Sequence, residues 1–514
     1  MLKLVVIFVL VFIRKLRSKS GKIYIQAVDK GSGRYKVLKS FGSASTASEL
    51  SGLVNVAQLW VNKQTGSSEF DFFKSDALIE QLFDSITAVK RVGYDLLLGR
   101  IFDDIGFGKV KDDIFRELVL ARVAFPKSKL KTTEYLYRYK QIDWDEDQLY
   151  RYLDKLHATQ KELVQQISYN HTLSILDNEI SIVFYDVTTL YFEIDQDDDL
   201  RKTGFSKEGK HQHPQIVLGL LVSKNGYPLA YDVFEGNKFE GHTMLPIVDS
   251  FRRRYNLKQL VIIADSGLLS KSNIDQLQAK GYEFVLGARI KNETTEIKKK
   301  ILTLSLENGQ SEIIKKGDLR LIITYSDDRA KKDRYNRDKG IRKLEKQIRI
   351  GRLTKASINN RGYNKFLKLE GQINVSLDDE KLKQESRWDG LKGYLTNAKL
   401  NKNQIIENYQ HLWQIEKAFR IAKSDLKIRP IYHRLARRIE AHICVSFAAY
   451  KLYKELERQL QEKKSTISAA KAIEIAENII QVSVTLPQTG EVRRKTLLLT
   501  QEQKYLNSIF NFGC

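Results

Sequence analysis

The chain has 514 residues, of which 42% are apolar, and a formal net charge of +23. This apolar content excludes an intrinsically disordered chain, and the length predicts about three or four domains. So large a positive charge indicates a polyanionic partner, for which nucleic acid is the first candidate. The two cysteines, Cys444 and Cys514, exclude a disulfide-stabilised fold and favour a cytoplasmic location.

The N-terminal region opens with an apolar run, residues 4–13, that is followed by Arg14 and Lys15. The run is too short to cross a bilayer, which needs about 20 residues, and it lacks the small-residue cleavage site of a signal peptide. We therefore expect no membrane association. Residues 11–42 are predicted to form a small basic β-meander with Gly- and Ser-rich turns. A nucleic-acid contact and a solvated sheet face explain its basic side equally well.

Residues 46–178 are predicted to be mainly helical. In the stretch "DDIFRELVLARVAF", Ile114 and Leu118 follow helical spacing, and the stretch stops before Pro126. We interpret this region as a helical DNA-binding segment.

From residue 180 the pattern becomes that of an α/β domain, with antiparallel strands first and then strands alternating with helices. Asn225-Gly226 is a strong hairpin turn signal between two of these strands. The predicted strands are residues 181–185, 189–194, 215–223, 227–234, 260–265 and 283–288, and the predicted helices are residues 242–254 and 270–280.

Two of these strands end in a carboxylate. Asp186 follows "IVFY" and Asp265 follows "VIIA". Either residue alone is commonly explained as a turn or helix-capping residue. Two such residues at the carboxyl ends of buried strands lie where open α/β sheets bind ligands.

A third acid, Glu416, lies in a helical pattern that covers residues 403–426. It follows Tyr409 at i+7, so it occupies a place on the stripe where an apolar residue is expected. An ion pair with Arg420 at i+4 would make it an ordinary surface residue. A cluster with the two aspartates explains all three acids together.

Three carboxylates close together raise one another's pKa, and a divalent cation removes that cost. A small number of carboxylate oxygen ligands suits Mg²⁺ or Mn²⁺. Two such ions about 3.5–4 Å apart can assist an in-line phosphoryl transfer. A basic chain with an acidic metal cluster therefore predicts cleavage or strand transfer of DNA.

The α/β pattern is interrupted from about residue 289, and we predict a β-rich, basic insertion over residues 289–402. Residues 329–368 contain 15 Lys or Arg and 3 acidic residues. A solvated helical face is the plain alternative, but Gly340 is expected to break such a helix. We predict that this stretch contacts the phosphate backbone of DNA. The candidate contacts are Arg342, Lys343, Arg349 and Arg352.

Three motifs in order resemble the DDE transposases of bacterial insertion sequences: "IVFYDVTTLYFE", "VIIADSG" and "YQHLWQIEKAFRIAKSDL". The chain is similar in particular to the insertion-sequence-four-like group, whose RNase H-like core carries a β-rich insertion between the second Asp and the Glu. The 150 residues between Asp265 and Glu416 leave room for it. The stretches "FIRKLRSKSGKIYIQAV", "GFSKEGKHQHPQIVLGLLV" and "EGNKFEGHTM" also resemble this group, and the resemblance covers residues 12–460.

The resemblance implies that Asp186, Asp265 and Glu416 are catalytic and hold two Mg²⁺ ions. It also implies DNA contacts around the Glu, where the group's pattern is matched by a Tyr and a Lys, while its Arg position holds Leu412. This departure leaves open how the terminal phosphate is held and whether a hairpin intermediate forms. The candidate DNA contacts are Tyr409, Lys417, Arg420, Lys423, Lys207 and Lys210.

We therefore predict an α/β protein with an RNase H-like catalytic core, which is a mixed sheet flanked by helices, a β-rich insertion, an N-terminal β region and helical segments. The predicted regions are residues 1–45 (β-meander), 46–178 (helical), 179–288 (first part of the core), 289–402 (insertion), 403–460 (last part of the core with the Glu416 helix) and 461–514 (C-terminal tail). The predicted activity is cut-and-paste transposition: cleavage at the ends of an insertion sequence and strand transfer into target DNA. By resemblance, we expect a homodimer on double-stranded DNA in the bacterial nucleoid.

Other interpretations fit the sequence less well. His211 and His213 could bind zinc, but no further His or Cys accompanies them. An aspartyl-phosphate phosphatase would need a second Asp where Thr188 stands. Trp413 is expected in the core, and Trp388 is the better candidate for base stacking. A nuclease without strand transfer and a non-catalytic DNA-binding remnant stay as alternative functions.

Overall fold

The computed structural model describes residues 11–513 except residues 19, 32, 66–79, 81, 195, 206–208, 210–211, 354, 360, 371–373 and 487–488. The start of the N-terminal apolar run, Lys207, Lys210 and His211 therefore lie outside the described residues. The chain divides into two compact units, residues 1–88 with 483–493, and residues 89–482 with 494–514.

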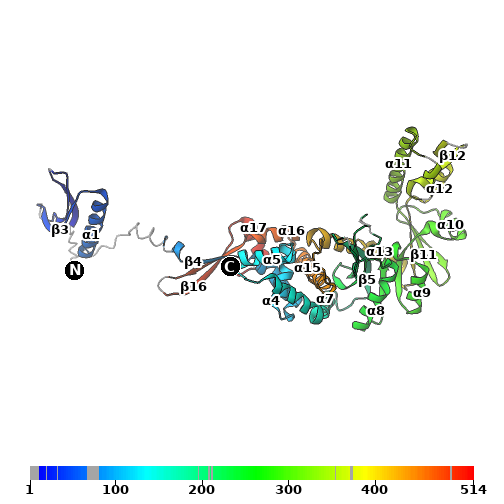
Figure 1. The fold of residues 1–514 in the computed structure, drawn as a ribbon, viewed down its shortest axis with the longest axis horizontal. Coiled ribbons are helices and arrows are strands. Elements are labelled where there is room, and N and C mark those ends of the chain that lie inside the picture. Colours follow the sequence, from blue (N-terminus) through cyan, green and yellow to red (C-terminus); the bar gives the residue numbers. More distant parts are fainter. Residues whose placement is uncertain are drawn as a thin grey trace, which may run out of the picture. The chain divides into compact units, whose positions relative to one another are not determined.

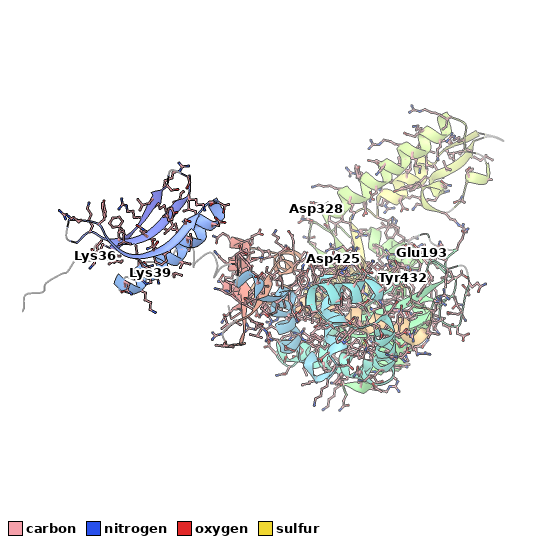
Figure 2. All side chains as sticks on the ribbon, turned by 60° about the vertical axis from the view of Figure 1, so that its left-hand side comes forward. Lys36, Lys39, Glu193, Asp328, Asp425 and Tyr432 are labelled. Carbon is pink, nitrogen blue, oxygen red and sulfur yellow. The ribbon has the colours of Figure 1, made fainter. Side chains whose placement is uncertain are left out.

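The first unit contains a three-stranded antiparallel sheet with the order β1-β2-β3 and the helix α1 packed against it (Figure 1). The elements are β1 (Val11–Arg17), β2 (Ile23–Asp29), β3 (Lys36–Ala44) and α1 (Ala47–Thr65). Ile25 and Ala27 are fully buried, whereas Lys36 and Lys39 on β3 are exposed (Figure 2). The β structure predicted for residues 11–42 is confirmed, and it presents lysines to solvent.

The second unit is organised around an eight-stranded mixed sheet with the order β10-β11-β14-β9-β8-β5-β6-β7. Its first five strands along the chain are β5 (Ile182–Tyr191), β6 (Gln215–Ser223), β7 (Pro228–Glu235), β8 (Val261–Ala264) and β9 (Glu283–Ala288). β5, β6 and β7 pair antiparallel, and β8 and β9 continue parallel from β5. This is the strand arrangement of an RNase H-like core, so the predicted fold class is confirmed.

Both faces of this sheet are covered, which explains why β6 is buried along its whole length. One face packs against α8 (Met244–Arg254) and α9 (Lys271–Ala279) in a core that includes Tyr185 and Ile262. The other face contributes Phe184 and Ile263 to a larger core. That core also contains α14 (Trp413–Arg420) and the helices that precede the sheet in sequence.

Those preceding helices gather around the long helix α15 (Ala436–Glu462), which packs against α4, α6 and α7 (Figure 1). They are η1 (Asp95–Gly99), α3 (Arg100–Ile105), α4 (Asp113–Ala124), α5 (Lys129–Tyr135), η3 (Leu136–Lys140), α6 (Glu146–Lys155), η4 (Leu156–Gln160) and α7 (Lys161–Ile175). α4 begins after an Asp112 cap and ends before Pro126, as predicted. A segment from the C-terminal third of the chain thus completes the core of the N-terminal helices.

A smaller sheet has the order β16-β15-β4, and two helices accompany it in sequence. The elements are β4 (Ile86–Arg91), β15 (Ile480–Thr485), β16 (Val492–Leu497), α16 (Ala469–Glu477) and α17 (Gln501–Phe510).

One strand boundary differs from its prediction. The two strands predicted at 181–185 and 189–194 form a single strand, β5, that passes through Asp186. Pairing with β6 continues to Tyr191, so the strand has no reason to stop at the carboxylate. The parallel pairing with β8 does stop there, after Tyr185 and Ala264.

The insertion adds strands to the core sheet and also contains helices. Strands β10 (Ser311–Lys316), β11 (Leu319–Tyr325) and β14 (Leu391–Thr396) extend the sheet from β9. The remaining elements are α10 (Thr295–Leu302), α11 (Asp327–Arg349), β12 (Leu367–Glu370), β13 (Asn374–Leu377) and α12 (Asp379–Ser386). α12, β12 and β13 share a small core with α11.

The expected helix break at Gly340 is wrong, because α11 runs continuously through it. Gly340 instead permits a close contact: a Cβ at this position would lie 2.3 Å from the ring of Tyr363. The Tyr363 hydroxyl donates to the Asn336 carbonyl at 3.0 Å, so this ring docks the following segment on α11.

Gly340→Ala is therefore expected to destabilise the insertion, although Gly→Ala in an open helix usually stabilises by about 1 kcal/mol. Hydrogen exchange should accelerate both in α11 and at residues 362–370. Adding Tyr363→Ala should restore protection of α11, since the ring that clashes is gone. The matched control is Gly52→Ala in α1, where a Cβ meets nothing within 4 Å. Unchanged exchange in Gly340→Ala would contradict this account.

Candidate active site

Asp186 and Asp265 lie at matched positions on neighbouring parallel strands. Tyr185 and Ala264 are the last register partners of β5 and β8, and the two aspartates are the next residues. Side chains alternate between the faces of a sheet, so both aspartates share the face of Phe184, which packs in the same core as α14. The register therefore presents both carboxylates on the face that α14 covers.

Asp265 is fixed by two hydrogen bonds to its Oδ1 atom. The Ser266 amide donates to it at 2.6 Å and the Tyr409 hydroxyl at 3.3 Å. Tyr409 lies in α13 (Lys402–Gln410) and is 4% exposed. Burial, and next the nearby Asp265 carboxylate, raise the pKa of Tyr409 well above its usual value. The hydroxyl therefore stays protonated and donates to the carboxylate.

A glycine keeps room for this contact. A Cβ on Gly287 of β9 would lie 2.4 Å from the Tyr409 hydroxyl and 3.0 Å from the Ser266 amide nitrogen. Any larger residue at this position would have to displace the tyrosine hydroxyl from Asp265.

Glu416 and Asp265 line one cavity of about 520 Å³. Glu416 is exposed on α14, while Ile415 and Phe419 on the same helix are buried. The predicted position of Glu416 on the apolar stripe is therefore wrong. α13 ends at Gln410 and α14 begins at Trp413, so the intervening turn breaks the helical periodicity that the prediction carried across it.

Trp413 also differs from its prediction as a core residue, because it is 50% exposed and lines the cavity of Asp265 and Glu416. Trp388, predicted to be the better stacking residue, is half-buried and packs in the core of the insertion. Trp413 stands three residues before Glu416, and this i, i+3 spacing was the sequence signal for a shared helix face.

Two cations from the insertion, Arg329 and Lys392, reach the same cavity. The Lys392 Nζ atom lies 4.5 Å from the centre of the Tyr409 ring. Burial, and next the charge of Arg329, lower the pKa of Lys392, whereas Asp265 and Glu416 oppose that shift. Sequence reasoning missed Lys392, because only the pairing of β14 with β9 carries it to this place.

A second cavity of about 720 Å³ shares Ser266, Arg329 and Lys392 with the first. Its other basic lining residues are Arg289, Lys291, Arg337 and Lys365. Two of these, Lys291 and Lys365, lie 2.5 and 2.8 Å from the carboxylate of Glu385. The cavity of Asp265 and Glu416, which two cations also line, thus lies beside one lined mainly by basic residues.

The three acids are not gathered into one metal-binding cluster. Among the described residues, no group of three or more His, Cys, Asp and Glu side chains is arranged to hold a metal ion. Asp265 and Glu416 share a cavity, and Asp186 lies beside Asp265 in the sheet without lining that cavity. As a donor set, three carboxylates fit Mg²⁺ or Mn²⁺, which prefer oxygen ligands.

The residues predicted to contact DNA differ in their exposure and in their ion pairs. Lys417 is held by Glu457, with Nζ 2.9 Å from the carboxylate, whereas Arg420 is exposed on the same side of α14 as Glu416. Lys423 lies in the π-helical segment η10 (Ile421–Asp425) and is half-buried. The four basic candidates of the insertion are all exposed: Arg342, Lys343, Arg349 and Arg352.

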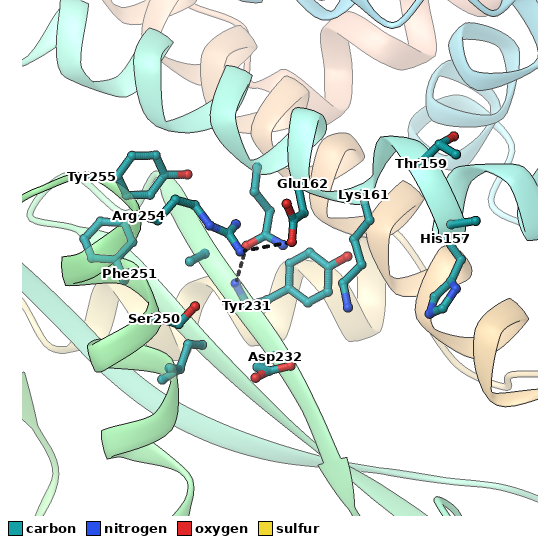
Figure 3. A pocket seen from close by; sticks show the side chains of 14 residues that line it. His157, Thr159, Lys161, Glu162, Tyr231, Asp232, Ser250, Phe251, Arg254 and Tyr255 are labelled. Carbon is teal, nitrogen blue, oxygen red and sulfur yellow. Dashed lines mark hydrogen bonds and ion pairs between the residues drawn. The ribbon is translucent and has the colours of Figure 1, made fainter.

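A separate polar cavity of about 320 Å³ lies between α7, α8 and β7 (Figure 3). Its cations are paired with carboxylates: Arg254 lies 3.7 Å from Glu162, and Lys161 lies 2.5 Å from Glu440. None of the three candidate catalytic acids lines this cavity. Its Arg254 and Lys161 side chains are each paired with a carboxylate of the same chain.

The fold and the paired carboxylates define the class: an RNase H-like protein with an aspartate on each of two neighbouring central strands, Asp186 within β5 and Asp265 directly after β8. A family model described as "Transposase DDE domain" matches residues 177–452. This match covers more than half of the chain, which therefore belongs to the transposase DDE domain family. The protein is a DDE transposase, an enzyme that cleaves DNA and transfers strands in transposition.

No curated protein matches the sequence. Among solved structures, a piggyBac transposase synaptic complex with hairpin DNA is 10% identical, with a TM-score of 0.36 over 75% of this chain and 78% of that one. A Mos1 transposase paired-end complex with the left transposon end is 10% identical, with a TM-score of 0.15 over 31% of this chain and 53% of that one. A Mos1 mariner paired-end complex with Mn is 12% identical, with a TM-score of 0.15 over 31% and 54%. In the described part of the chain, no helix is long and apolar enough to cross a membrane.

Gly287→Ala and Tyr409→Phe are each expected to slow DNA cleavage about 10- to 100-fold, the usual cost of losing a residue that orients a ligand. The double variant should lose little more than either single variant, because both changes break the same contact with Asp265. The measurement is a double-mutant cycle on the cleavage rate, with thermal unfolding as a check on folding. Additive losses would argue that Tyr409 does not act through Asp265.

Proposed function

We propose that Asp186, Asp265 and Glu416 are the catalytic acids of this transposase and together hold Mg²⁺, or Mn²⁺, for cleavage at the ends of an insertion sequence and strand transfer. The observation that supports this most is the register of β5 and β8, which makes Asp186 and Asp265 neighbours on the face that α14 covers. The shared cavity of Asp265 and Glu416 adds the third carboxylate.

Bound divalent ions would supply an activated attacking oxygen and stabilise the leaving oxygen of an in-line displacement. In the first reaction a water oxygen bonds to the phosphorus at the transposon end, and the bond to the 3′ oxygen breaks. In the second reaction that 3′-hydroxyl attacks a phosphodiester of the target, so one P–O bond replaces another. Tyr409 orients Asp265 through both reactions, because its hydroxyl remains a donor.

Charge and exposure indicate which residues bind DNA. Leu412, at the position where the insertion-sequence-four-like group has Arg, is 8% exposed and apolar, so it cannot hold a phosphate. We infer that Arg329 and Lys392 supply positive charge to this cavity instead. Arg420 extends that surface along α14, and the exposed Trp413 ring offers a stacking surface for a base beside the cut.

The basic exposed side of α11 is proposed to track the DNA backbone. Two transposon ends must be held together for strand transfer, so we propose a homodimer in the synaptic complex. We also propose that the chain belongs to the insertion-sequence-four-like group. Because its substrate is DNA, we propose that it acts at the bacterial nucleoid.

Asp186→Asn, Asp265→Asn and Glu416→Gln should each reduce cleavage at least about a thousandfold, because several kcal/mol of charge stabilisation are lost. DNA binding should persist, and EDTA should abolish the activity of the unaltered protein. The substrate is DNA that carries the element's own flanking repeats. Asp275→Asn, an exposed acid on α9, is the control and should remain active. Full activity in any one of the three variants removes that residue from the site.

Replacing Arg342, Lys343 and Arg349 by Gln should weaken DNA binding regardless of sequence. Each lost phosphate contact should reduce the slope of log K against log salt by about 0.9. A salt series with duplex DNA measures this slope. Lys300→Gln is the control, because its Nζ lies 3.3 Å from Glu296 on the same helix, α10. An unchanged slope in the triple variant would assign α11 to another role.

A further inference from the structure

A fourth cavity, of about 290 Å³, lies between the segment that follows α4, the helix α5 and residues 427–433. It shares no lining residue with the cavity of Asp265 and Glu416. Its lining is strongly basic: it includes one carboxylate, Glu146, and the cations Arg122, Lys127, Lys129, Lys427 and Arg429.

Two of these cations are almost completely buried. Arg122 is 6% exposed and Lys129 is 5% exposed. The Arg122 Nη1 atom donates to the Lys427 carbonyl at 3.3 Å, but its Nε atom has no partner among the described residues. No hydrogen bond or ion pair joins the Lys129 ammonium to any other residue that the structure describes.

The carboxylates near this cavity are engaged elsewhere. Glu146 accepts a hydrogen bond from the Tyr150 hydroxyl. Asp154 is held by Arg437 and Arg438, with Nε atoms 2.8 and 3.0 Å from its Oδ1 atom. The cavity therefore contrasts with the one in Figure 3, where each cation faces a carboxylate.

Burial leaves the Arg122 guanidinium charged. Burial lowers the pKa of Arg122 to about 10, so the guanidinium is still charged at neutral pH. Burial, and next the neighbouring Arg122, lower the pKa of Lys129 well below its usual value. A buried cation without a counter-charge costs several kcal/mol, and an anion from outside the chain would recover that free energy.

We propose that this cavity binds a phosphate group, contributed either by a DNA backbone or by free inorganic phosphate. The buried Arg122 and Lys129 supply charge-assisted donors that suit phosphate oxygens. Lys127 and Lys427 are exposed at the edge of the cavity. Tyr432, 70% exposed, lies at the same edge (Figure 2), so the cavity can be reached from solvent.

The position of the site connects it to the Glu416 helix. Residues 427–433 follow η10, which continues directly from α14. The His442 Nε2 atom lies 2.9 Å from the Ile428 carbonyl oxygen. Arg122 donates a hydrogen bond to the carbonyl of the preceding residue, Lys427. A bound phosphate would hold the segment that leaves the Glu416 helix. The site itself does not depend on which acids bind metal.

The test uses the full-length protein and inorganic phosphate at constant ionic strength against chloride. Phosphate should raise the melting temperature of the unaltered protein, and the rise should grow with concentration as for a ligand that binds the folded state. Lys129→Met and Arg122→Met should each weaken phosphate binding at least tenfold by calorimetry. Lys131→Met, on the same helix but exposed, is the control and should bind phosphate normally.

Lys129→Met in chloride alone separates binding from a structural role. Because it removes a buried amino group that has no counter-charge among the described residues, it should leave the protein as stable as before or make it more stable. A loss of stability in chloride together with an unchanged response to phosphate would overturn the proposal. Absence of any difference between phosphate and chloride for the unaltered protein would also overturn it.

A second arm distinguishes the two sources of phosphate. If a DNA backbone supplies the ligand, Lys129→Met should reduce the salt slope of duplex binding by about 0.9, and phosphate should compete with DNA. If free phosphate is the ligand, the variant should lose phosphate binding while the salt slope of DNA binding stays the same. Either result supports the site, and binding of both ligands at full strength by Lys129→Met excludes it.

Discussion

The parallel pairing of β5 with β8 is the constraint on which the proposed active site depends. Because Tyr185 and Ala264 are register partners, the next residues on both strands are carboxylates on one face. A slip of one residue between these strands would move one aspartate to the opposite face of the sheet. Burial of Phe184 and Ile263 on one side, and of Tyr185 and Ile262 on the other, opposes such a slip.

Two of the three proposed acids are accessible to solvent, while Asp186 is half-buried within β5. Asp265 and Glu416 are exposed, so little desolvation opposes their charge before a cation arrives. Lys392 and Arg329, both from the insertion, line the same cavity as these two acids. The insertion therefore adds positive charge to a proposed site whose acids come from the core.

Local signals predicted much of this fold. The strand at 283–288 and the turn at Gly226 were correct, because period and turn chemistry are properties of the segments themselves. Features set by distant partners were not predictable. The length of β5 depends on pairing with β6, and the exposure of Glu416 depends on the turn between α13 and α14. Lys392 enters the cavity only because β14 pairs with β9.

The place of β14 has an evolutionary consequence. It lies between β11 and β9 in the continuous sheet, so the 289–402 segment is not an appendage that a deletion could remove cleanly. Its loss would leave β9 paired only with β8, and the exposed edge of β9 would be prone to aggregation. Related proteins should accordingly differ in the length of the segment from α11 to α12, which lies between β11 and β14. They should keep the strands that join this segment to the core sheet.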